Sequence, residues 1–262
     1  MSWIGLPPGN ILQQLYLKER VNFYKNKYQY RKFLEIGSGN GHISYVLLNN
    51  GYKGVGIDLN NSACLNNQKL NQKHILLGNY QVINNDFLSY PFKEKFDIII
   101  ACMVIEHIPD NKLKEFLNKI KSLLSENGTA IFFVPSNMRY WNIEDEIAGH
   151  IKRYEFKDIK KICEEHKFSL VKIAALNYPI SNVLFHLSNY LIEKHESNIK
   201  NLSQKEKTIY TGNRNVPFKT TFPKILNLIL NPIVLYPFHI LQKLFLNQLN
   251  HSLVLYFEIK NK

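Results

Sequence analysis

The sequence has few cysteines and no long apolar run. Its three cysteines, Cys64, Cys102 and Cys163, are scattered and form no CxxC pair, which argues against a disulfide framework or a zinc finger and for a reducing compartment. No uninterrupted apolar stretch reaches the roughly 18 residues that a membrane-spanning helix needs. The first residues lack a basic region followed by an apolar one, so we expect no signal peptide. These absences predict a cytoplasmic protein.

Acidic residues are also scarce. The chain has 33 lysines and arginines against 21 aspartates and glutamates, a net charge of +12. Such an excess suits a polyanion or an anionic membrane surface, although many lysines stand beside asparagines, as on a solvated face. Apolar residues make up 45% of the 262 residues, enough for a buried core. The length predicts one large domain, or one domain with an insertion.

Short apolar runs alternate with helical patterns after an amphipathic helix near residues 10–28. Such alternation predicts a parallel sheet built from βαβ units. One connecting helix starts near Asp110, which can cap it, and ends before Gly128, where a left-handed residue is expected. Another covers Lys157–His166. The predicted strands are Lys32–Ile36, Gly54–Asp58, Gln81–Asn84, Asp97–Cys102, Thr129–Val134, Ser169–Ala174 and Ser252–Ile259.

The alternation stops between residues 175 and 250. Residues 193–220 are polar and charged, which predicts a loop or lid. Residues 222–249 are apolar, and Pro223, Pro232 and Pro237 divide them into short helices. Three interpretations of the apolar part stay open: a lid over an apolar substrate, an interfacial segment 222–246 that touches a membrane, and a helical layer packed on the core or in a homodimer.

The most informative segment is FLEIGSGNGHIS, in which an apolar strand runs into Gly37, Gly39 and Gly41 and then into a helix. Glycines at such a turn let a ligand approach the backbone closely. His42 stands where a dinucleotide fingerprint needs a small residue. The acid Glu35, inside the strand, disfavours a pyrophosphate and favours a positively charged ligand such as an amino group or a sulfonium. An NAD-dependent reductase is therefore the least favoured enzyme.

Two more acids follow the next predicted strands. Asp58 ends the second strand, where a carboxylate can accept hydrogen bonds from ribose hydroxyls or cap the next helix. Asp86 follows the third strand, where it can accept a hydrogen bond from an adenine amino group or serve as a turn residue. Because both acids stand in register with the glycine turn, we favour their roles in ligand binding.

Taken in order, the segments FLEIGSGNGHIS, GVGIDLN, NNDFLSYPF, FDIIIACMVIEHIPD and LLSENGTAIFFVPS resemble the successive motifs of class I S-adenosylmethionine-dependent methyltransferases over residues 30–136. The resemblance implies an α/β, Rossmann-like, seven-stranded sheet in the order 3-2-1-4-5-7-6, with strand 7 antiparallel and helices on both faces. It divides the chain into an N-terminal helical segment (1–29), a methyltransferase core (30–174), a helical insertion or lid between strands 6 and 7 (175–250) and a final strand (251–262).

The same resemblance implies S-adenosylmethionine as the cofactor. The acid and glycines of the first turn are expected to bind its methionine part. The end of strand two is expected to bind its ribose, and the end of strand three its adenine. Cys102, at the end of strand four, is expected beside the methyl-donor end. The implied cofactor-binding residues are Glu35, Gly37, Ser38, Gly39, Gly41, Asp58, Leu59, Asp86, Phe87 and Cys102.

Glu106 and His107 follow the fourth strand, on the side where open α/β sheets bind ligands. Either can take a proton from an acceptor, or the pair caps and orients the loop. The segment also resembles the Glu-x-x-Glu-His pattern of two metal-assisted groups, the ubiquinone-pathway O-methyltransferases and the small-RNA 2′-O-methyltransferases. Met103 replaces the first glutamate, and a thioether is a poor ligand for Mg²⁺, so we predict no metal.

A second cluster stands downstream, where a Gly-His pair precedes basic and aromatic residues. This pattern resembles, more loosely, small-molecule members of the family. It implies His150 as a substrate-side base and an acceptor pocket lined by Trp141, Arg153 and Tyr154. The alternative is a packed surface helix.

The sequence therefore predicts transfer of a methyl group to O or N of a small molecule, with a saccharide or a lipid-linked intermediate as candidate acceptors. One alternative is an RNA methyltransferase, which the basic charge suggests, although no recognisable RNA-binding module is present. Another is a non-catalytic cofactor-binding or membrane-associated scaffold. Nucleic acid is thus a partner that we do not favour, whereas a homodimer and peripheral membrane contact stay open.

Overall fold

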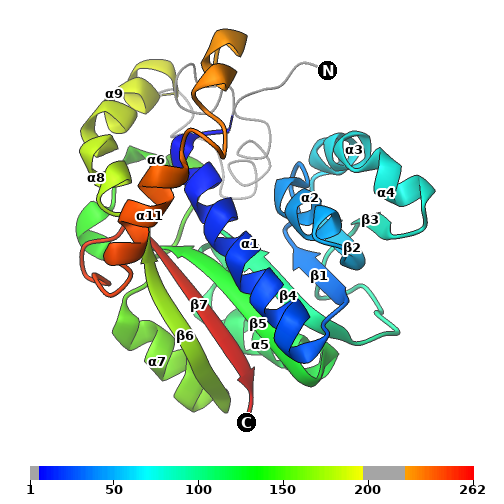
Figure 1. Ribbon diagram of the computed structural model, residues 1–262. Helices are drawn as coiled ribbons and strands as arrows, with labels where there is room; N and C mark the ends of the chain where they lie inside the picture. Colours follow the sequence, from blue (N-terminus) through cyan, green and yellow to red (C-terminus); the bar gives the residue numbers. More distant parts are fainter. Residues whose placement is uncertain (1–5, 197–221) are drawn as a thin grey trace.

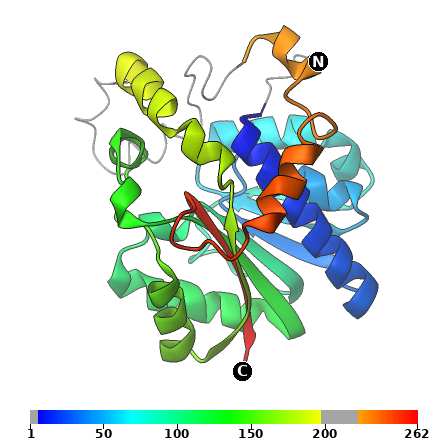
Figure 2. The same ribbon diagram turned by 60° about the vertical axis from the view of Figure 1, so that its left-hand side comes forward.

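The computed structural model describes residues 6–196 and 222–262. A seven-stranded sheet runs through the molecule, with helices on both faces (Figures 1 and 2). The strand order is β3-β2-β1-β4-β5-β7-β6. Strand β7 is antiparallel to both of its neighbours, and the pairs among the first five strands are parallel. The fold predicted from the motifs is confirmed.

Every predicted strand is present, and most bounds shift by one or two residues. The strands are β1 (Lys32–Ile36), β2 (Lys53–Asp58), β3 (Tyr80–Asn84), β4 (Phe96–Cys102), β5 (Leu124–Pro135), β6 (Phe168–Leu176) and β7 (Val254–Asn261). The central strand β4 is apolar on both sides because helices cover both faces of the sheet. Its Ile98 and Ile100 lie in one core cluster, and Ile99 and Ala101 lie in the other.

Each face of the sheet has its own set of helices. The larger helices of the core are α1 (Pro8–Tyr28), α2 (His42–Asn49), α3 (Asn61–Leu70), α5 (Asp110–Leu123) and α7 (Phe156–Glu165), and two shorter ones are α4 (Gln72–Leu76) and α6 (Ile143–Ala148). The first two share a core cluster with β4 and β5, whereas α5 and α7 pack in the other cluster. This arrangement leaves the carboxyl ends of β1, β2 and β4 open at one edge.

Two expectations for the helix before β5 are wrong. Asp110 is the first residue of α5 and not its cap, and its carboxylate accepts a hydrogen bond from Lys152 Nζ at 2.7 Å. Gly128 does not end the helix in a left-handed turn, because the chain becomes extended directly at Leu124. Gly128 lies inside β5, where a Cβ would stand 3.0 Å from the Phe96 carbonyl oxygen. The absence of a side chain at Gly128 therefore allows its backbone to lie close to that of Phe96.

The segment between β6 and β7 adds helices α8 (Ile180–Val183), α9 (Phe185–Glu196), η4 (Lys224–Leu228) and α11 (Tyr236–Leu244). Helix α11 lies beside α1 (Figures 1 and 2), where His239 Nε2 is 2.9 Å from Glu19 Oε1. Pro237 sits in the first turn of α11, a position that proline favours, so it starts this helix. Most of the polar stretch 193–220 lies outside the described residues. Within the described ranges, no helix is long and apolar enough to cross a membrane.

Candidate active site

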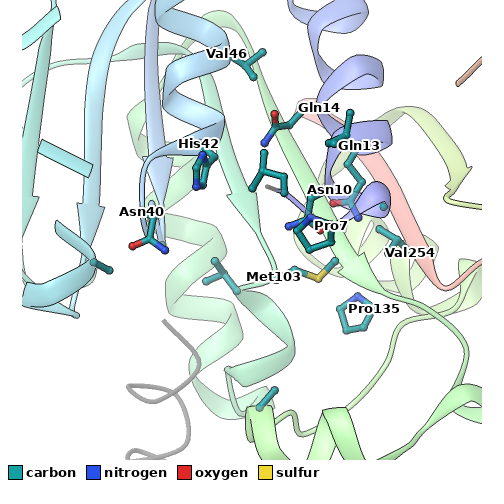
Figure 3. Close-up of a pocket in the computed structure, with 18 of the residues that line it drawn as sticks. Pro7, Asn10, Gln13, Gln14, Asn40, His42, Val46, Met103, Pro135 and Val254 are labelled. Carbon is teal, nitrogen blue, oxygen red and sulfur yellow. The ribbon is translucent and has the colours of Figure 1, made fainter. Parts of the chain in front are cut away.

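A cavity of about 3200 Å³ opens at the carboxyl ends of the central strands. Figure 3 shows Asn40 of the glycine turn and His42, the first residue of α2, on one side of the cavity. Pro7, which precedes α1, and Asn10 of α1 lie on the other side, with Met103 between the two sides. Helices α8 and α9 also contribute to the wall. Ligand pockets commonly occupy roughly 300–1,000 Å³. The cavity therefore has room for a cofactor together with an acceptor molecule.

The glycine turn forms one wall of the cavity. The backbone N–H groups of Gly37 and Ser38 donate to the Ile57 carbonyl oxygen at 2.9 and 3.1 Å, which fixes the turn against β2. Gly41 has a φ of 80°, and a Cβ there would lie 2.2 Å from Asn67 Oδ1. A Cβ on Gly39, by contrast, would meet nothing within 4 Å. The turn thus leaves open space where a ligand can approach the backbone.

Asp58 connects this turn to the end of β2. Its carboxylate accepts hydrogen bonds from the backbone N–H groups of Gly39 and Asn60, each at 2.8 Å. A carboxylate oxygen can accept more than one hydrogen bond, so Asp58 keeps accepting capacity for a ligand in the cavity that it lines. The next residue, Leu59, is well exposed and also lines the wall.

Glu35 lies behind the cavity wall. It is buried, and its carboxylate accepts hydrogen bonds from the backbone N–H of Ser44, at 2.9 Å, and from the Ser44 hydroxyl. Burial raises the pKa of Glu35 to about 8, against the lowering effect of these bonds, and the charge of Asp58 raises it further. Ser38 and Gly41 also lie outside the wall. A cation bound nearby would favour the ionised form of Glu35.

Asp86 and Phe87 line the cavity beyond Asp58. Asp86 Oδ1 accepts a hydrogen bond from the Leu88 backbone N–H at 3.2 Å, which makes it a turn residue as well. The Phe87 ring is mostly buried and meets Phe116 edge-on, with ring centroids 5.1 Å apart. Cys102 is absent from the wall, and burial raises the pKa of its thiol.

The short helix η1 (Ile105–His107) follows β4 and carries two candidate catalytic residues. His107 and His150 meet edge-on, with ring centroids 4.9 Å apart, and both line the cavity. Glu106 is fully buried, and its Oε1 lies 3.8 Å from His150 Nε2. Burial raises the pKa of Glu106 to about 7 and lowers the pKa of His107 to about 4. The fold therefore brings together three groups from two segments, η1 and the residues that follow α6.

Asp145 is a functional candidate that the sequence did not indicate. Its buried carboxylate lies 2.7 Å from His150 Nδ1 and accepts hydrogen bonds from Arg153 Nε at 2.9 and 3.0 Å. Burial alone would raise the pKa of Asp145, but the bonds to His150 and Arg153 lower it. The one local signal is the capping box that Asp145 forms with Asn142 at the start of α6. Asp145 thus orients His150.

The predicted acceptor-binding residues divide into two groups. Arg153 reaches the cavity wall, although its guanidinium is occupied by Asp145 and by the Ser136 carbonyl oxygen. Tyr154 is fully buried and donates a hydrogen bond to the Ile105 carbonyl oxygen at 2.9 Å. Trp141 is half-buried and outside the wall. Tyr154 therefore connects its loop to η1 and does not face the cavity.

Comparison with known proteins shows which protein family this chain resembles. Residues 11–173 match a family model described as a methyltransferase domain. The chain is 32% identical over 123 residues to the ubiquinone biosynthesis O-methyltransferase of Glaesserella parasuis serovar 5 (strain SH0165), a match that covers 45% of this chain and 50% of the relative. The enzyme of the same description from Histophilus somni (strain 2336) is 28% identical over 122 residues, covering 45% and 48%. The chain thus spans about half the length of the curated relatives it matches.

Solved structures share the fold at low sequence identity. Magnesium protoporphyrin IX methyltransferase from Synechocystis PCC 6803, in its structure with bound S-adenosylhomocysteine, superposes with a TM-score of 0.53 at 18% identity over 64% of this chain and 78% of that one. The methyltransferase domain of bacterial CtHen1 gives a TM-score of 0.51 at 18% identity, over 63% and 91%. The family match covers more than half of the chain, so this protein belongs to the class I S-adenosylmethionine-dependent methyltransferases.

Proposed function

We propose that this protein transfers a methyl group from S-adenosylmethionine to an oxygen or nitrogen atom of a small molecule. One observation carries the proposal. A single cavity is lined at one side by the glycine turn, Asp58 and Asp86, and at another by His107 and His150. In this proposal a cofactor site and proton-accepting groups share one cavity.

In this proposal the residues of the first side hold the cofactor. The open space over Gly39 admits its methionine part, and the carboxylates of Asp58 and Asp86 accept hydrogen bonds from ribose and adenine. The buried acid Glu35 favours the positive charges of the amino group and the sulfonium. When bound, the cofactor supplies a methyl group that is already activated, and the pair of electrons in the carbon–sulfur bond stays with sulfur.

The residues of the second side act on the acceptor. They align its lone pair, exclude water and receive the proton that leaves an acceptor hydroxyl or ammonium group. Orientation of this kind contributes roughly 7–11 kcal/mol in well-aligned reactions. His107 and His150 are the candidate proton acceptors, since burial keeps His107 neutral and Asp145 orients His150.

We further propose that the acceptor is apolar or lipid-linked and is reached at an anionic membrane surface. The segment from η4 to α11 exposes large apolar side chains, among them Ile233, at 85%, and Leu228 and Leu244, each at 75%. Figures 1 and 2 show η4 and α9 at the same end of the molecule, away from the C-terminus. Leu184, Leu187 and Leu230 of this insertion also line the cavity. The net charge of +12 suits an anionic surface.

The test is a transfer assay with methyl-labelled S-adenosylmethionine against lipid, saccharide and RNA extracts, with Asp58→Ala as the inactive control. Label in a small-molecule or lipid fraction, lost in the variant, supports the proposal. Label in RNA would favour the alternative acceptor class, and no label in any fraction would favour a scaffold.

Sedimentation with anionic vesicles tests the membrane part. The wild type is expected to sediment with the vesicles, and Ile233→Glu is expected to stay in solution. If both stay in solution and the wild type is dimeric by light scattering, the apolar segment is a subunit interface.

A further inference from the structure

Four uncharged carboxamide side chains line the cavity across from the glycine turn. Asn10, Gln13 and Gln14 come from α1, and Asn177 directly follows β6. Positions 10, 13 and 14 share one face of a helix, because residues three and four apart are neighbours there. Figure 3 shows Asn10 and Gln13 on the same side of the cavity as Val254, the first residue of β7. We call these four carboxamides the amide wall.

Two members of the amide wall are buried without a hydrogen-bond partner in the described part of the chain. Gln13 is 9% exposed and Asn177 is 5% exposed. Asn177 Oδ1 is fully buried and accepts no hydrogen bond, and no hydrogen bond joins the Gln13 amide to another described residue. Buried polar atoms in native proteins nearly always have partners, so two orphaned amides on one cavity wall point to a ligand.

The position of Asn177 is fixed by its backbone. Its N–H donates to Gln242 Oε1 at 2.7 Å, and its carbonyl oxygen accepts from the Ser181 N–H at 2.7 Å. Its φ of 68° is a left-handed conformation that asparagine tolerates. A Cβ on Gly9 would lie 2.9 Å from Asn177 Nδ2, so the amide packs against the first turn of α1. The fold therefore holds this amide beside the carboxamides of α1.

We propose that the amide wall binds the hydroxyl groups of an uncharged sugar in the acceptor. A primary amide carries both donors and an acceptor, which matches a hydroxyl group, itself a donor and an acceptor. An apolar chain would bring no partner for the buried amides, which is costly. An ionised phosphate only accepts hydrogen bonds, so it would leave Asn177 Oδ1 unpaired. Lys18, the next residue along this face of α1, is exposed one turn beyond Gln14.

The amide wall lies apart from the place where the methyl group is proposed to be transferred. Strand β6 is three positions from β4 in the sheet. Neighbouring strands lie roughly 4.8 Å apart, so Asn177 is on the order of 14 Å from the end of β4. The amide wall therefore binds a part of the acceptor that is remote from the reacting atom.

Apolar side chains continue the cavity next to the amide wall. Leu184 and Leu187, a few residues after Asn177, line the same space and can contact a lipid chain. A sugar on the amides and a chain on the leucines together describe a lipid-linked saccharide. This inference rests on the proposed function, and it narrows the acceptor from an apolar or lipid-linked molecule to a lipid-linked saccharide.

The subsite is tested with amphiphiles that share one tail and differ in the head group. Octyl glycosides of glucose, galactose and mannose are compared with octyl phosphate and octanol, each below the concentration at which it forms micelles. Binding is measured by calorimetry, with and without S-adenosylhomocysteine. We expect at least one glycoside to bind about 10-fold more tightly than octanol and octyl phosphate. Equal binding of all head groups, or tightest binding of the phosphate, overturns the subsite.

The variants Gln13→Leu and Asn177→Gly remove the two buried amides. Glycine suits a φ of 68°, so the second variant removes the side chain without backbone strain. Both are expected to weaken glycoside binding about 10-fold and to leave S-adenosylhomocysteine affinity unchanged. Gln13→Leu is also expected to raise the urea midpoint, because it replaces an unpartnered buried amide by an apolar side chain. Gln68→Leu, at an exposed glutamine of α3, is the control and is expected to bind like the wild type.

The S-adenosylhomocysteine measurements separate this inference from the proposed function. Folded wild type that binds S-adenosylhomocysteine but no octyl glycoside overturns the subsite and leaves the proposed function intact. Glycoside binding without S-adenosylhomocysteine binding supports the subsite and contradicts the proposed function. Loss of S-adenosylhomocysteine affinity in Gln13→Leu or Asn177→Gly would mean that the amides hold the cofactor, and it overturns the inference. Glycoside binding that is unchanged in both variants does the same.

Discussion

Glu35 gives the protein a stability that depends on pH in an unusual direction. Its pKa is raised from 4.5 to about 8 by burial, so the folded state keeps a proton that the unfolded state loses above pH 4.5. Stability therefore falls as pH rises from about 4.5 to 8. At 1.36 kcal/mol per pH unit, a pKa raised from 4.5 to about 8 corresponds to about 5 kcal/mol of stability at most.

The perturbation is Glu35→Gln, which keeps the shape of the side chain and removes its titration. Urea unfolding of both proteins at pH 5 and pH 8 measures the effect. We expect the wild type to lose several kcal/mol more than the variant between the two pH values. Parallel pH profiles of the two proteins would refute the reasoning, because they would mean that the Glu35 carboxyl titrates alike in the folded and unfolded states.

Three further predictions concern other parts of the molecule. Gly41→Ala is expected to destabilise the fold by a few kcal/mol, because its Cβ would overlap a buried asparagine, whereas Gly78→Ala, at a similar φ but in open space, is expected to cost only about 1 kcal/mol in thermal unfolding. Arg20→Met is expected to cost about 3–5 kcal/mol by urea unfolding, because it leaves the fully buried Glu258 carboxylate without its bidentate partner; a cost below 1 kcal/mol would contradict this. His150→Gln is expected to lower kcat by about 10²–10⁴-fold while S-adenosylhomocysteine affinity stays near that of the wild type; equal losses in both would mean that His150 acts through the fold.

Features set by local sequence were predictable. The apolar runs of β1 to β4 and the glycine turn are contiguous, and the acids that follow β2 and β3 stand at the ends of their strands, so the sequence alone placed them at one edge of the sheet. The depth of Glu35 behind the wall was not predictable, because it depends on the helix α2 that closes over it. The early start of β5 was not predictable either. Leu124 is already extended and Gly128 lies inside the strand, where β4 and β5 pair with a shift in register between Phe96 and Ile98.

The acceptor side was predicted only as separate residues. His150 and Glu106 are far apart in sequence, and the Ile151 backbone N–H joins their segments by donating to the Glu106 carbonyl oxygen at 2.8 Å. Asp145 gave no chemical signal beyond a helix cap. Tyr154 was predicted to line the pocket because it is aromatic and follows a basic residue, yet its hydroxyl donates a hydrogen bond to the Ile105 carbonyl oxygen. Long-range packing decides such positions, and no local pattern encodes it.

The central claim is that the cavity beside the glycine turn is a site for S-adenosylmethionine. Calorimetric titration with S-adenosylhomocysteine tests it most directly, with Asp58→Ala as the matched variant. Loss of two charge-assisted hydrogen bonds to ribose, each about 1.5–3 kcal/mol, predicts weakening by roughly 10²–10⁴-fold. Micromolar binding by the wild type that the variant loses is the expected result. Absence of binding by folded wild type, or equal binding by the variant, would contradict the account.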